Sequence, residues 1–248
     1  MSAYPTRALV LAAGLGSRIR SVAGDLPKPL IAFAGRPILA HNLRWLAAGG
    51  VREVVINLHY GADQIRAAIG DGAAFGLAVD YVFEPELLGT AGALGNVWRH
   101  AGDGVSNTWV VYGDNILNCD LGAVWRAHCD RAGEATVVLF DPARHANTGI
   151  AGGRVAVDQT GLVSGFVEGP GEGLVNAGLY VVEPSVSDLI PADRLIDFGR
   201  DVFPAMLAGR RRLAAHIMEP EGVCLGLDTP EAYAAGQALL AAGRVRLT

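Results

Sequence analysis

Residues 7–18 read RALVLAAGLGSR, an apolar run that opens into a glycine-rich turn. The uninterrupted apolar character of 7–13 predicts a strand buried on both faces of a sheet. Gly14 and Gly16 let the backbone approach a phosphate chain, whose oxygens the exposed N–H groups would cradle. No GKS or GKT follows, and the third glycine of a dinucleotide fingerprint is absent, so the turn is neither a Walker loop nor a dinucleotide site.

Strand-like and helix-like segments alternate from this first strand onward. In chain order they are a helix at 37–49, a strand at 51–58, a helix at 62–69, a strand at 78–83, a helix at 89–100 and a strand at 108–112. This β-α-β-α-β-α-β order predicts an α/β fold of the Rossmann-like type, with a mixed, mostly parallel sheet flanked by helices. Ligands of such sheets bind at the carboxyl ends of the strands, so we expect the site in the loops after the first and fourth strands.

The second half of the chain is less regular, and no internal repeat or flexible linker divides it from the first. In the last predicted helix, Thr229 is the expected N-cap and Pro230 the first helical residue. The remaining predicted elements are strands at 135–140, 154–157 and 173–182 and helices at 198–207 and 229–242.

Composition and charge restrict the class of protein. With 51% hydrophobic and 18% charged residues among 248, the chain has the make-up of a compact globular protein. Its net charge of −5 argues against a nucleic-acid partner, which would require a basic face. Three cysteines without a CxxC pair favour a reducing compartment, and the apolar stretch 8–15 is too short to span a membrane. We expect a cytoplasmic protein without a membrane partner, and a homo-oligomer is left open.

One basic residue differs from all the others. Of 20 basic residues, Lys28 is the single lysine and the other 19 are arginines. It lies in the segment LPKPL at 26–30, where a proline on each side stiffens the backbone and holds the lysine in place. Together with Arg18, it offers positive charge to a triphosphate at the glycine-rich turn. We expect Lys28 to be an exposed loop residue that contributes little to folding stability.

The motifs and their order resemble those of the sugar-1-phosphate nucleotidyltransferases, or NDP-sugar pyrophosphorylases, and especially short bacterial mannose- and heptose-1-phosphate guanylyltransferases. The resemblance implies one domain over 1–248, with a nucleotide-binding half (1–112), a metal and sugar-phosphate half (113–228) and a C-terminal helix (229–248). The signature GxGSR…LPKPL is followed by a base-binding loop LGTAGAL (88–94), a metal-binding turn YGDN (112–115), a sugar-contacting strand VNAGLY (175–180) and a terminal-helix motif LDTPE (227–231).

The resemblance implies transfer of a nucleoside monophosphate from an NTP to a sugar 1-phosphate, with release of pyrophosphate. A sugar phosphate is already anionic at neutral pH, so it needs charge neutralisation and in-line alignment rather than a general base. The expected catalytic residues are Arg18, Lys28 and Asp114. Asp114 ends a buried strand and suits Mg²⁺, although an ordinary turn aspartate is the alternative. The expected nucleotide contacts are Leu11, Ala12, Ala13, Gly14, Gly16, Ser17, Glu84, Gly89 and Thr90.

Four residues are the expected contacts of the sugar phosphate: Asn115, Gly149, Glu168 and Asn176. By resemblance, Glu168 accepts hydrogen bonds from sugar hydroxyls, and a glutamate in a surface turn is the alternative. Asn176 lies among apolar residues of a predicted strand, and a buried amide needs partners. Those partners are either a sugar hydroxyl or groups of the chain itself.

The sugar loop departs from the family pattern. Gly169 follows Glu168 at the place where the family usually has a lysine that contacts the sugar phosphate. A cation is therefore missing from the loop. Arg144, Arg154 or Arg194 could replace it.

A second departure concerns the metal. The position at which we expect the family's second metal ligand is Gly226, and Asp228 lies two residues further on. Asp228 is kept as a candidate ligand, but it could instead cap the terminal helix, because an aspartate is favourable at a helix N-terminus. Mg²⁺ would then rest on Asp114, with phosphate oxygens and waters completing its shell.

The base is predicted from Glu84, five residues before Gly89, where relatives often have a glutamine. A carboxylate only accepts hydrogen bonds, and guanine presents two adjacent donors that match a bidentate acceptor. Glu84 therefore favours GTP, with a surface-facing glutamate as the alternative. The rival functions are the same reaction with UTP, dTTP or CTP, a non-sugar acceptor such as a cyclitol phosphate, and a non-catalytic nucleotide- or sugar-binding module.

Overall fold

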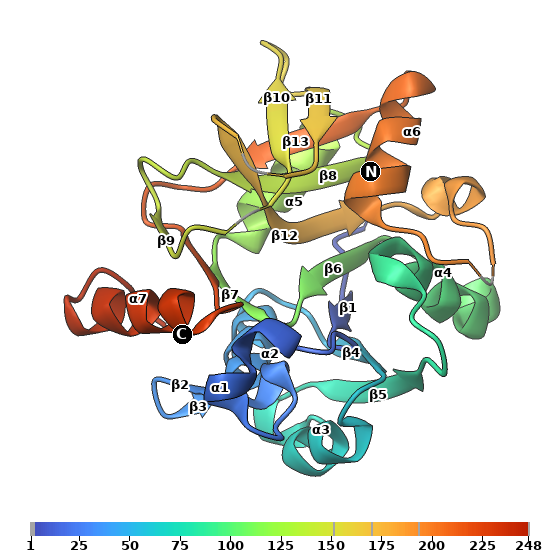
Figure 1. The fold of residues 1–248 in the computed structure, drawn as a ribbon. Helices are drawn as coiled ribbons and strands as arrows, with labels where there is room; N and C mark the ends of the chain where they lie inside the picture. The colour runs from blue at the N-terminus through green and yellow to red at the C-terminus, as the bar shows by residue number, and fades with distance from the viewer. Residues whose placement is uncertain (1–2, 151, 170, 193, 248) are drawn as a thin grey trace.

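The computed structural model describes residues 3–150, 152–169, 171–192 and 194–247 (Figure 1). Within these ranges, a nine-stranded mixed sheet forms the centre of the molecule. Its parallel part consists of β1 (Arg7–Leu11), β4 (Glu53–Leu58), β5 (Ala78–Phe83) and β6 (Thr108–Tyr112). These strands lie in the order β6-β1-β4-β5.

The sheet continues beyond β6 with strands of the second half of the chain. They are β8 (Ala135–Phe140), β10 (Arg154–Val157), β11 (Val163–Val167), β12 (Leu174–Val182) and β13 (Leu213–Ile217). β12 is antiparallel to both β6 and β8, β10 lies antiparallel between β12 and β11, and β13 is parallel to β8. The predicted mixed sheet with flanking helices is confirmed.

Two small sheets lie beside the central one. The hairpin of β2 (Ala32–Phe33) and β3 (Arg36–Pro37) follows the LPKPL segment. The other small sheet has the order β7-β14-β9 and consists of β7 (Asn115–Asn118), β14 (Val223–Gly226) and β9 (Ala146–Asn147). Because β14 pairs with β7, the end of the chain lies directly beside the segment that follows β6.

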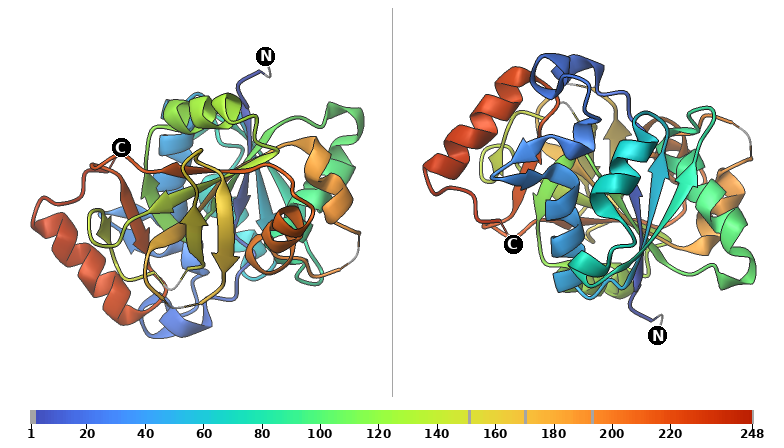
Figure 2. Two further views of the ribbon diagram at one scale, coloured as in Figure 1. Left: turned by 90° about the horizontal axis from the view of Figure 1, so that it is seen from above. Right: turned by 90° about the horizontal axis from the view of Figure 1, so that it is seen from below.

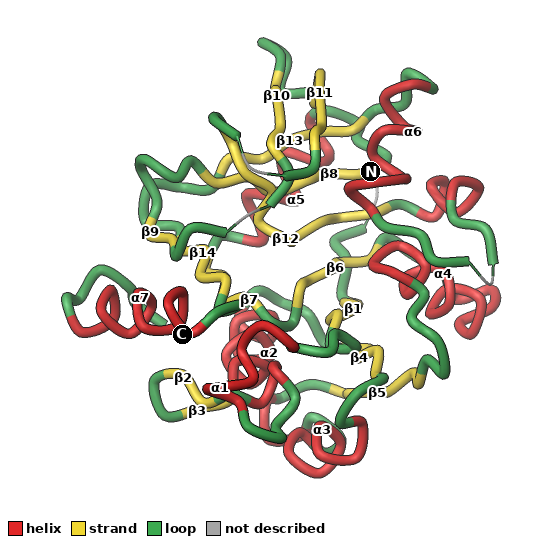
Figure 3. The backbone as a smooth tube through the Cα atoms, in the orientation of Figure 1, coloured by secondary structure: helices red, strands yellow, loops and turns green. Residues whose placement is uncertain are grey.

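Helices cover both faces of the central sheet (Figure 3). Their bounds are α1 (Arg20–Ala23), α2 (Ile38–Ala48), α3 (Ala62–Ile69), α4 (Gly89–Ala101), α5 (Leu121–Asp130), α6 (Phe203–Ala208) and α7 (Pro230–Ala241). The core of one face contains side chains of α2, α3 and α5, and the core of the other contains side chains of α4 and α6. α7 lies at the periphery, against β14 of the three-stranded sheet (Figure 2).

Alternation along β1 explains why one strand contributes to two cores. Successive side chains of a strand point to opposite faces of the sheet. Ala8 and Val10 are accordingly buried on the face of α2, whereas Leu9 is buried on the face of α4. The unbroken apolar run in the sequence therefore fits a strand that is covered on both sides.

The strand order reverses direction at β1 and thereby positions the site. β1 pairs with β4 on one side and with β6 on the other. Loops that leave the carboxyl ends of two such strands diverge and leave a crevice between them, in which ligands of α/β sheets bind. Here these are the glycine-rich turn after β1 and the Gly113-Asp114 turn after β6.

Several predicted elements differ in their bounds from those observed, and two of these differences lie beside the site. The first strand ends at Leu11 instead of residue 13, because the Ala12 N–H leaves the ladder and donates to Asn57 Oδ1 at 2.8 Å. The predicted helix at 198–207 begins as a wider π-helical turn, Phe198–Val202, before α6. None of the helices within the described residues is long and apolar enough to cross a membrane.

Candidate active site

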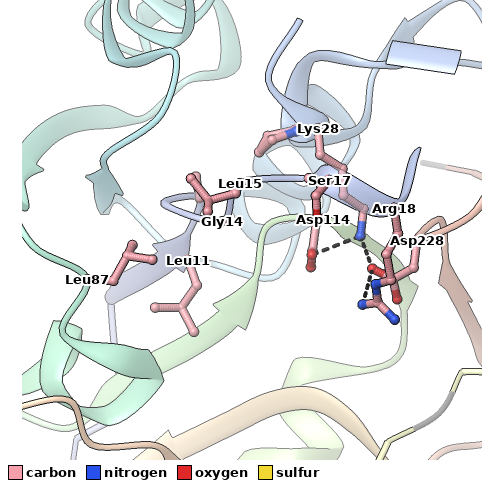
Figure 4. A pocket seen from close by; sticks show the side chains of 12 residues that line it. Leu11, Gly14, Leu15, Ser17, Arg18, Lys28, Leu87, Asp114 and Asp228 are labelled. Carbon is pink, nitrogen blue, oxygen red and sulfur yellow. Dashed lines mark hydrogen bonds and ion pairs between the residues drawn. The ribbon is translucent and has the colours of Figure 1, made fainter. Parts of the chain in front are cut away.

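The glycine-rich turn brings Arg18 and Lys28 to the carboxyl end of β1. Gly16 has φ +59°, and a Cβ there would stand 3.1 Å from the Cβ of Lys28, so a side chain would crowd the lysine. Short 3-10 turns at Ser17–Ile19 and Lys28–Leu30 carry the two cations. Both project toward the turn after β6 (Figure 4).

Lys28 is buried, contrary to the expectation of an exposed loop lysine. Only 4% of the residue is exposed. Its Nζ donates to Asp114 Oδ2 at 2.9 Å and to Asp228 Oδ1. Burial by itself lowers the pKa of Lys28, but the two carboxylates more than offset this and the pKa is raised above its ordinary value. Lys28 is therefore a charged residue that joins two segments of the fold.

Asp228 points into the site and does not cap the terminal helix. The N-cap of α7 is Thr229, whose side chain accepts from the Ala232 N–H at 3.2 Å, as the sequence predicted. Asp228 instead faces Lys28, and the guanidinium of Arg18 lies 3.5 Å from its Oδ1. Asp228 thus brings a second carboxylate to the site, two residues after Gly226.

Gly226 itself has no room for a carboxylate. It lies in β14, and a Cβ at this position would be only 2.5 Å from Cγ1 of Ile150. The departure at this position is explained by packing, and the site retains two aspartates. Both aspartates lie at the edge of the three-stranded sheet, because Asp114 directly precedes β7 and Asp228 follows β14.

The two aspartates form a donor set that suits Mg²⁺. Mg²⁺ takes one or two protein carboxylates and fills its shell with phosphate oxygens and waters. Asp114 and Asp228 both place an oxygen against the same ammonium, so their carboxylates converge on one point. The described residues hold no cluster of three or more metal-ligating side chains.

A first pocket of about 330 Å³ surrounds this cluster. The backbone of the glycine-rich turn forms one wall, and the charged residues form the end (Figure 4). Among the predicted residues, it is lined by Leu11, Ala12, Gly14, Gly16, Ser17, Arg18, Lys28, Asp114 and Asp228. The Arg18 side chain is 70% exposed at its mouth.

A second pocket of about 340 Å³ adjoins the first and shares Asp114 with it. It contains the remaining residues predicted to contact the nucleotide, which are Ala13, Glu84, Gly89 and Thr90. Glu84 is only 1% exposed, so it does not face the surface. Its Oε1 accepts from Asn57 Nδ2 at 2.9 Å and its Oε2 from the Leu88 N–H at 3.2 Å. Each oxygen keeps a further lone pair for a ligand.

Three further residues line the second pocket and were not among those predicted from the sequence: Asn57, Asp197 and Arg200. Asn57 connects two predicted parts of the site, because its Oδ1 accepts from Ala12 while its Nδ2 donates to Glu84. A polar residue near the end of the apolar strand VREVVINL was the available signal. Asp197 Oδ1 accepts from the Thr90 N–H at 3.1 Å and lies 3.2 Å from the Thr90 hydroxyl, a contact between segments that the sequence does not connect.

The residues predicted to contact the sugar phosphate lie outside both pockets. The Asn176 amide is satisfied by the chain itself, because it donates to the Tyr180 hydroxyl at 2.7 Å and accepts from the Gly178 N–H at 3.0 Å. Asn115 is buried in β7, and Gly149 forms a turn with φ +77°. Glu168 is exposed at the end of β11, and its carboxylate lies against Gly199. Their contacts with a sugar phosphate stay predictions.

Comparison with known proteins identifies relatives over nearly the whole chain. One is the mannose-1-phosphate guanylyltransferase of Mycobacterium tuberculosis, 34% identical over 98% of this chain and 67% of that protein. Another is the UTP–glucose-1-phosphate uridylyltransferase of Synechocystis, 29% identical over 89% of this chain and 60% of that protein. The chain thus spans about two thirds of the length of these relatives or less.

A solved structure has a similar fold. HddC from Yersinia pseudotuberculosis, in a complex with GMP-PN, is 25% identical and has a TM-score of 0.78 over 95% of this chain and 100% of that chain. The family model described as nucleotidyl transferase matches residues 7–222. This match covers the glycine-rich turn, Lys28 and Asp114. The chain belongs to the nucleotidyl transferase family.

Proposed function

We propose that the protein transfers GMP from GTP to a sugar 1-phosphate of the mannose type, giving a GDP-sugar and pyrophosphate. The observation that carries the proposal is the convergence of Lys28, Asp114 and Asp228 at the end of the glycine-rich turn. This arrangement places fixed positive charge and two oxygen ligands beside a backbone that can cradle phosphates. The mannose-1-phosphate guanylyltransferase named above supports the choice of donor and acceptor.

The chemistry follows from the charges of the substrates. A phosphate oxygen of the acceptor attacks the α-phosphorus of GTP, and the bond from the α-phosphorus to the bridging oxygen breaks as pyrophosphate leaves. Arg18 and Lys28 would neutralise the charge that grows on the leaving pyrophosphate, and such preorganised charges stabilise the transition state. Asp114 and Asp228 would hold Mg²⁺, which would neutralise phosphate charge when bound. The acceptor is anionic before it reacts, so the chain does not have to supply a general base.

Glu84 supports guanine as the base. Two hydrogen bonds, from Asn57 and from the Leu88 backbone, fix its carboxylate in the second pocket. Its free lone pairs can accept from the ring N–H and the amino group of guanine together. Uracil and thymine present one donor between two carbonyls and match this acceptor less well.

The test is a matrix of donors and acceptors. The protein is incubated with Mg²⁺, each NTP and a panel of sugar 1-phosphates together with a cyclitol phosphate, and pyrophosphate release is measured. We expect the fastest release with GTP and mannose 1-phosphate. Faster release with UTP, dTTP or CTP would refute the base assignment and leave the reaction class standing. No release from any pair would refute the enzymatic function.

Glu84→Gln tests the reading of the base. Two donors, Asn57 Nδ2 and the Leu88 N–H, now hold the Glu84 carboxylate. The NH₂ group of a glutamine would have to face one of these donors, and the base would lose one of its two hydrogen-bond acceptors. We expect kcat/KM for GTP to fall about tenfold, the effect of one lost charge-assisted hydrogen bond, and the preference for GTP over UTP to narrow. Glu86→Gln is the matched control, since Glu86 is exposed two residues away. An unchanged GTP-to-UTP ratio in Glu84→Gln would remove Glu84 from base selection.

A further inference from the structure

Several carboxylates lie in the second pocket, where an incoming sugar phosphate would meet them. Glu84, Asp114 and Asp197 all line the second pocket. The lysine that the family pattern predicts after Glu168 is replaced by Gly169, whose φ of +113° is unfavourable for any residue with a side chain. A doubly anionic sugar phosphate therefore needs a cation from another part of the chain.

The arginines suggested by the sequence do not fill this role. Of the described residues that line the two pockets, none is Arg144, Arg154 or Arg194. Arg154 is in addition engaged elsewhere, because its Nε donates to the Gly171 carbonyl at 2.5 Å.

Arg200 is an arginine that does line the second pocket. Its side chain is 74% exposed, and its NH1 lies 3.8 Å from Asp197 Oδ2, beyond hydrogen-bonding range. The guanidinium can therefore donate two hydrogen bonds to a phosphate without breaking a strong internal bond. Arg200 lies in the π-helical turn Phe198–Val202, which is anchored by Thr90: the Phe198 N–H donates to the Thr90 hydroxyl at 2.9 Å.

The same turn also holds Glu168, the residue expected to contact sugar hydroxyls. A Cβ on Gly199 would stand 1.7 Å from Glu168 Oε1, so only glycine permits this contact. Although Glu168 is exposed, partial desolvation of its carboxylate raises its pKa, while the neighbouring Arg200 acts in the opposite direction. The turn thus brings a carboxylate for sugar hydroxyls and a guanidinium for a phosphate side by side.

The position of Arg200 agrees with the geometry of the proposed reaction. The attacking and leaving oxygens of a phosphoryl-type transfer lie roughly in line, on opposite sides of the phosphorus. Arg18 and Lys28, the cations for the leaving pyrophosphate, line the first pocket, and Asp114 lies where the two pockets meet. A cation for the attacking phosphate is therefore expected outside the first pocket, and Arg200 lines the second.

We propose that Arg200 binds the phosphate of the acceptor and supplies the positive charge that Gly169 does not. This inference rests on the proposed function, because it assigns a residue to the acceptor of that reaction. Arg200 would touch the substrate directly, and its role does not depend on which base the donor carries.

The kinetic test compares Arg200→Met with Arg200→Lys. We expect Arg200→Met to raise KM for mannose 1-phosphate about 10- to 100-fold, the range for a lost charged hydrogen-bonding contact, with KM for GTP changed less than about twofold. Arg200→Lys keeps the charge but loses the planar fork, so its KM for mannose 1-phosphate should lie between those of the wild type and Arg200→Met. Arg126→Met is the matched control, since Arg126 is 69% exposed on α5 and lines neither pocket. An unchanged KM for mannose 1-phosphate in Arg200→Met, or equal increases for both substrates, would overturn the assignment.

A binding measurement separates this inference from the proposed function. Calorimetric titration with mannose 1-phosphate is carried out on protein loaded with Mg²⁺ and a GTP analogue that has a methylene α–β bridge. Weaker binding to Arg200→Met than to the wild type supports the inference even if the wild type releases no pyrophosphate. Equal binding to both proteins overturns it even if the wild type is an active enzyme. If neither protein binds mannose 1-phosphate, the inference and the proposed acceptor are both wrong.

Discussion

Charge balance around Lys28 governs the site at the scale of single residues. One buried ammonium faces Asp114 and Asp228, and Arg18 lies at the edge of the group. Lys28 therefore lies where the two carboxylates converge. If a divalent cation and a triphosphate bound here, the two carboxylates would turn to the metal and the ammonium of Lys28 would turn to the phosphates.

Lys28→Ala tests both roles of the lysine. Turnover should fall by about two orders of magnitude or more, as for other preorganised charge contacts. The free energy of unfolding should also fall by about 1–3 kcal/mol, because two carboxylates lose their shared partner, and Mg²⁺ should restore part of it. Urea unfolding with and without Mg²⁺ measures this, with Arg20→Ala, an exposed neighbour on α1, as the control. Near wild-type turnover, or unfolding insensitive to the change, would contradict the assignment.

Asp114→Asn and Asp228→Asn test the two predicted metal ligands separately. Each change removes a negative oxygen, so the Mg²⁺ concentration for half-maximal activity should rise about tenfold or more, equivalent to about 1.4 kcal/mol of binding energy. Asp120→Asn is the control, because Asp120 caps α5 at a distance from both pockets and asparagine caps equally well. A variant with the wild-type Mg²⁺ titration has lost no metal ligand.

At the scale of elements, the start of α7 separates two neighbouring functions. Thr229 caps the helix and Asp228 faces the lysine, although the two residues are adjacent. α7 follows β14, which pairs with β7 directly after Asp114. The pairing of β7 with β14 thus fixes the distance between the two aspartates, and α7 packs against β14.

Thr229→Ala should affect stability and leave the metal dependence unchanged. Loss of an N-cap threonine costs about 1 kcal/mol, because the Ala232 N–H loses its acceptor. Thermal unfolding and a Mg²⁺ titration of activity are measured on the same preparation. Thr229→Ser should restore the stability. A changed Mg²⁺ titration in Thr229→Ala would show that the cap and the metal site are not independent.

At the scale of the whole molecule, a buried histidine makes stability depend on pH. His128 on α5 is only 2% exposed. Its Nδ1 is hydrogen-bonded to the Thr136 hydroxyl at 2.8 Å, and a carboxylate oxygen of Glu183 lies 3.5 Å from its Nε2. Burial lowers the pKa of His128 to about 4 from its ordinary value of 6.5. Between these values, the unfolded chain binds a proton that the folded chain does not, so stability is lost as the pH falls through this window.

His128→Gln should reduce this loss of stability. A histidine with this shift contributes about 1.4 kcal/mol per pH unit within the window, so the wild type should lose more stability than the variant between pH 6.5 and 5. Urea unfolding at these pH values measures the difference, and His100→Gln is the control because His100 is exposed. Equal pH slopes in the wild type and His128→Gln would show that His128 does not titrate as stated.

Local patterns in the sequence determined many of the elements and the general place of the site. The apolar runs of β5, β6 and β8 and the helical segment of α3 have the predicted bounds, because side-chain periodicity and flanking glycines act within a few residues. The carboxyl ends of β1 and β6 were predicted for the same reason. A parallel sheet brings these ends together whatever side chains they carry.

Only the tertiary structure decided which side chains meet. Lys28 and Asp228 are 200 positions apart in the sequence, and the burial of the lysine depends on the strand pairing that brings β14 to β7. The clash that excludes a carboxylate at 226 comes from Ile150, and the approach of Glu168 to the turn that carries Arg200 depends on the missing side chain of Gly199. Such contacts arise from packing between distant segments, which periodicity and spacing along one chain do not encode.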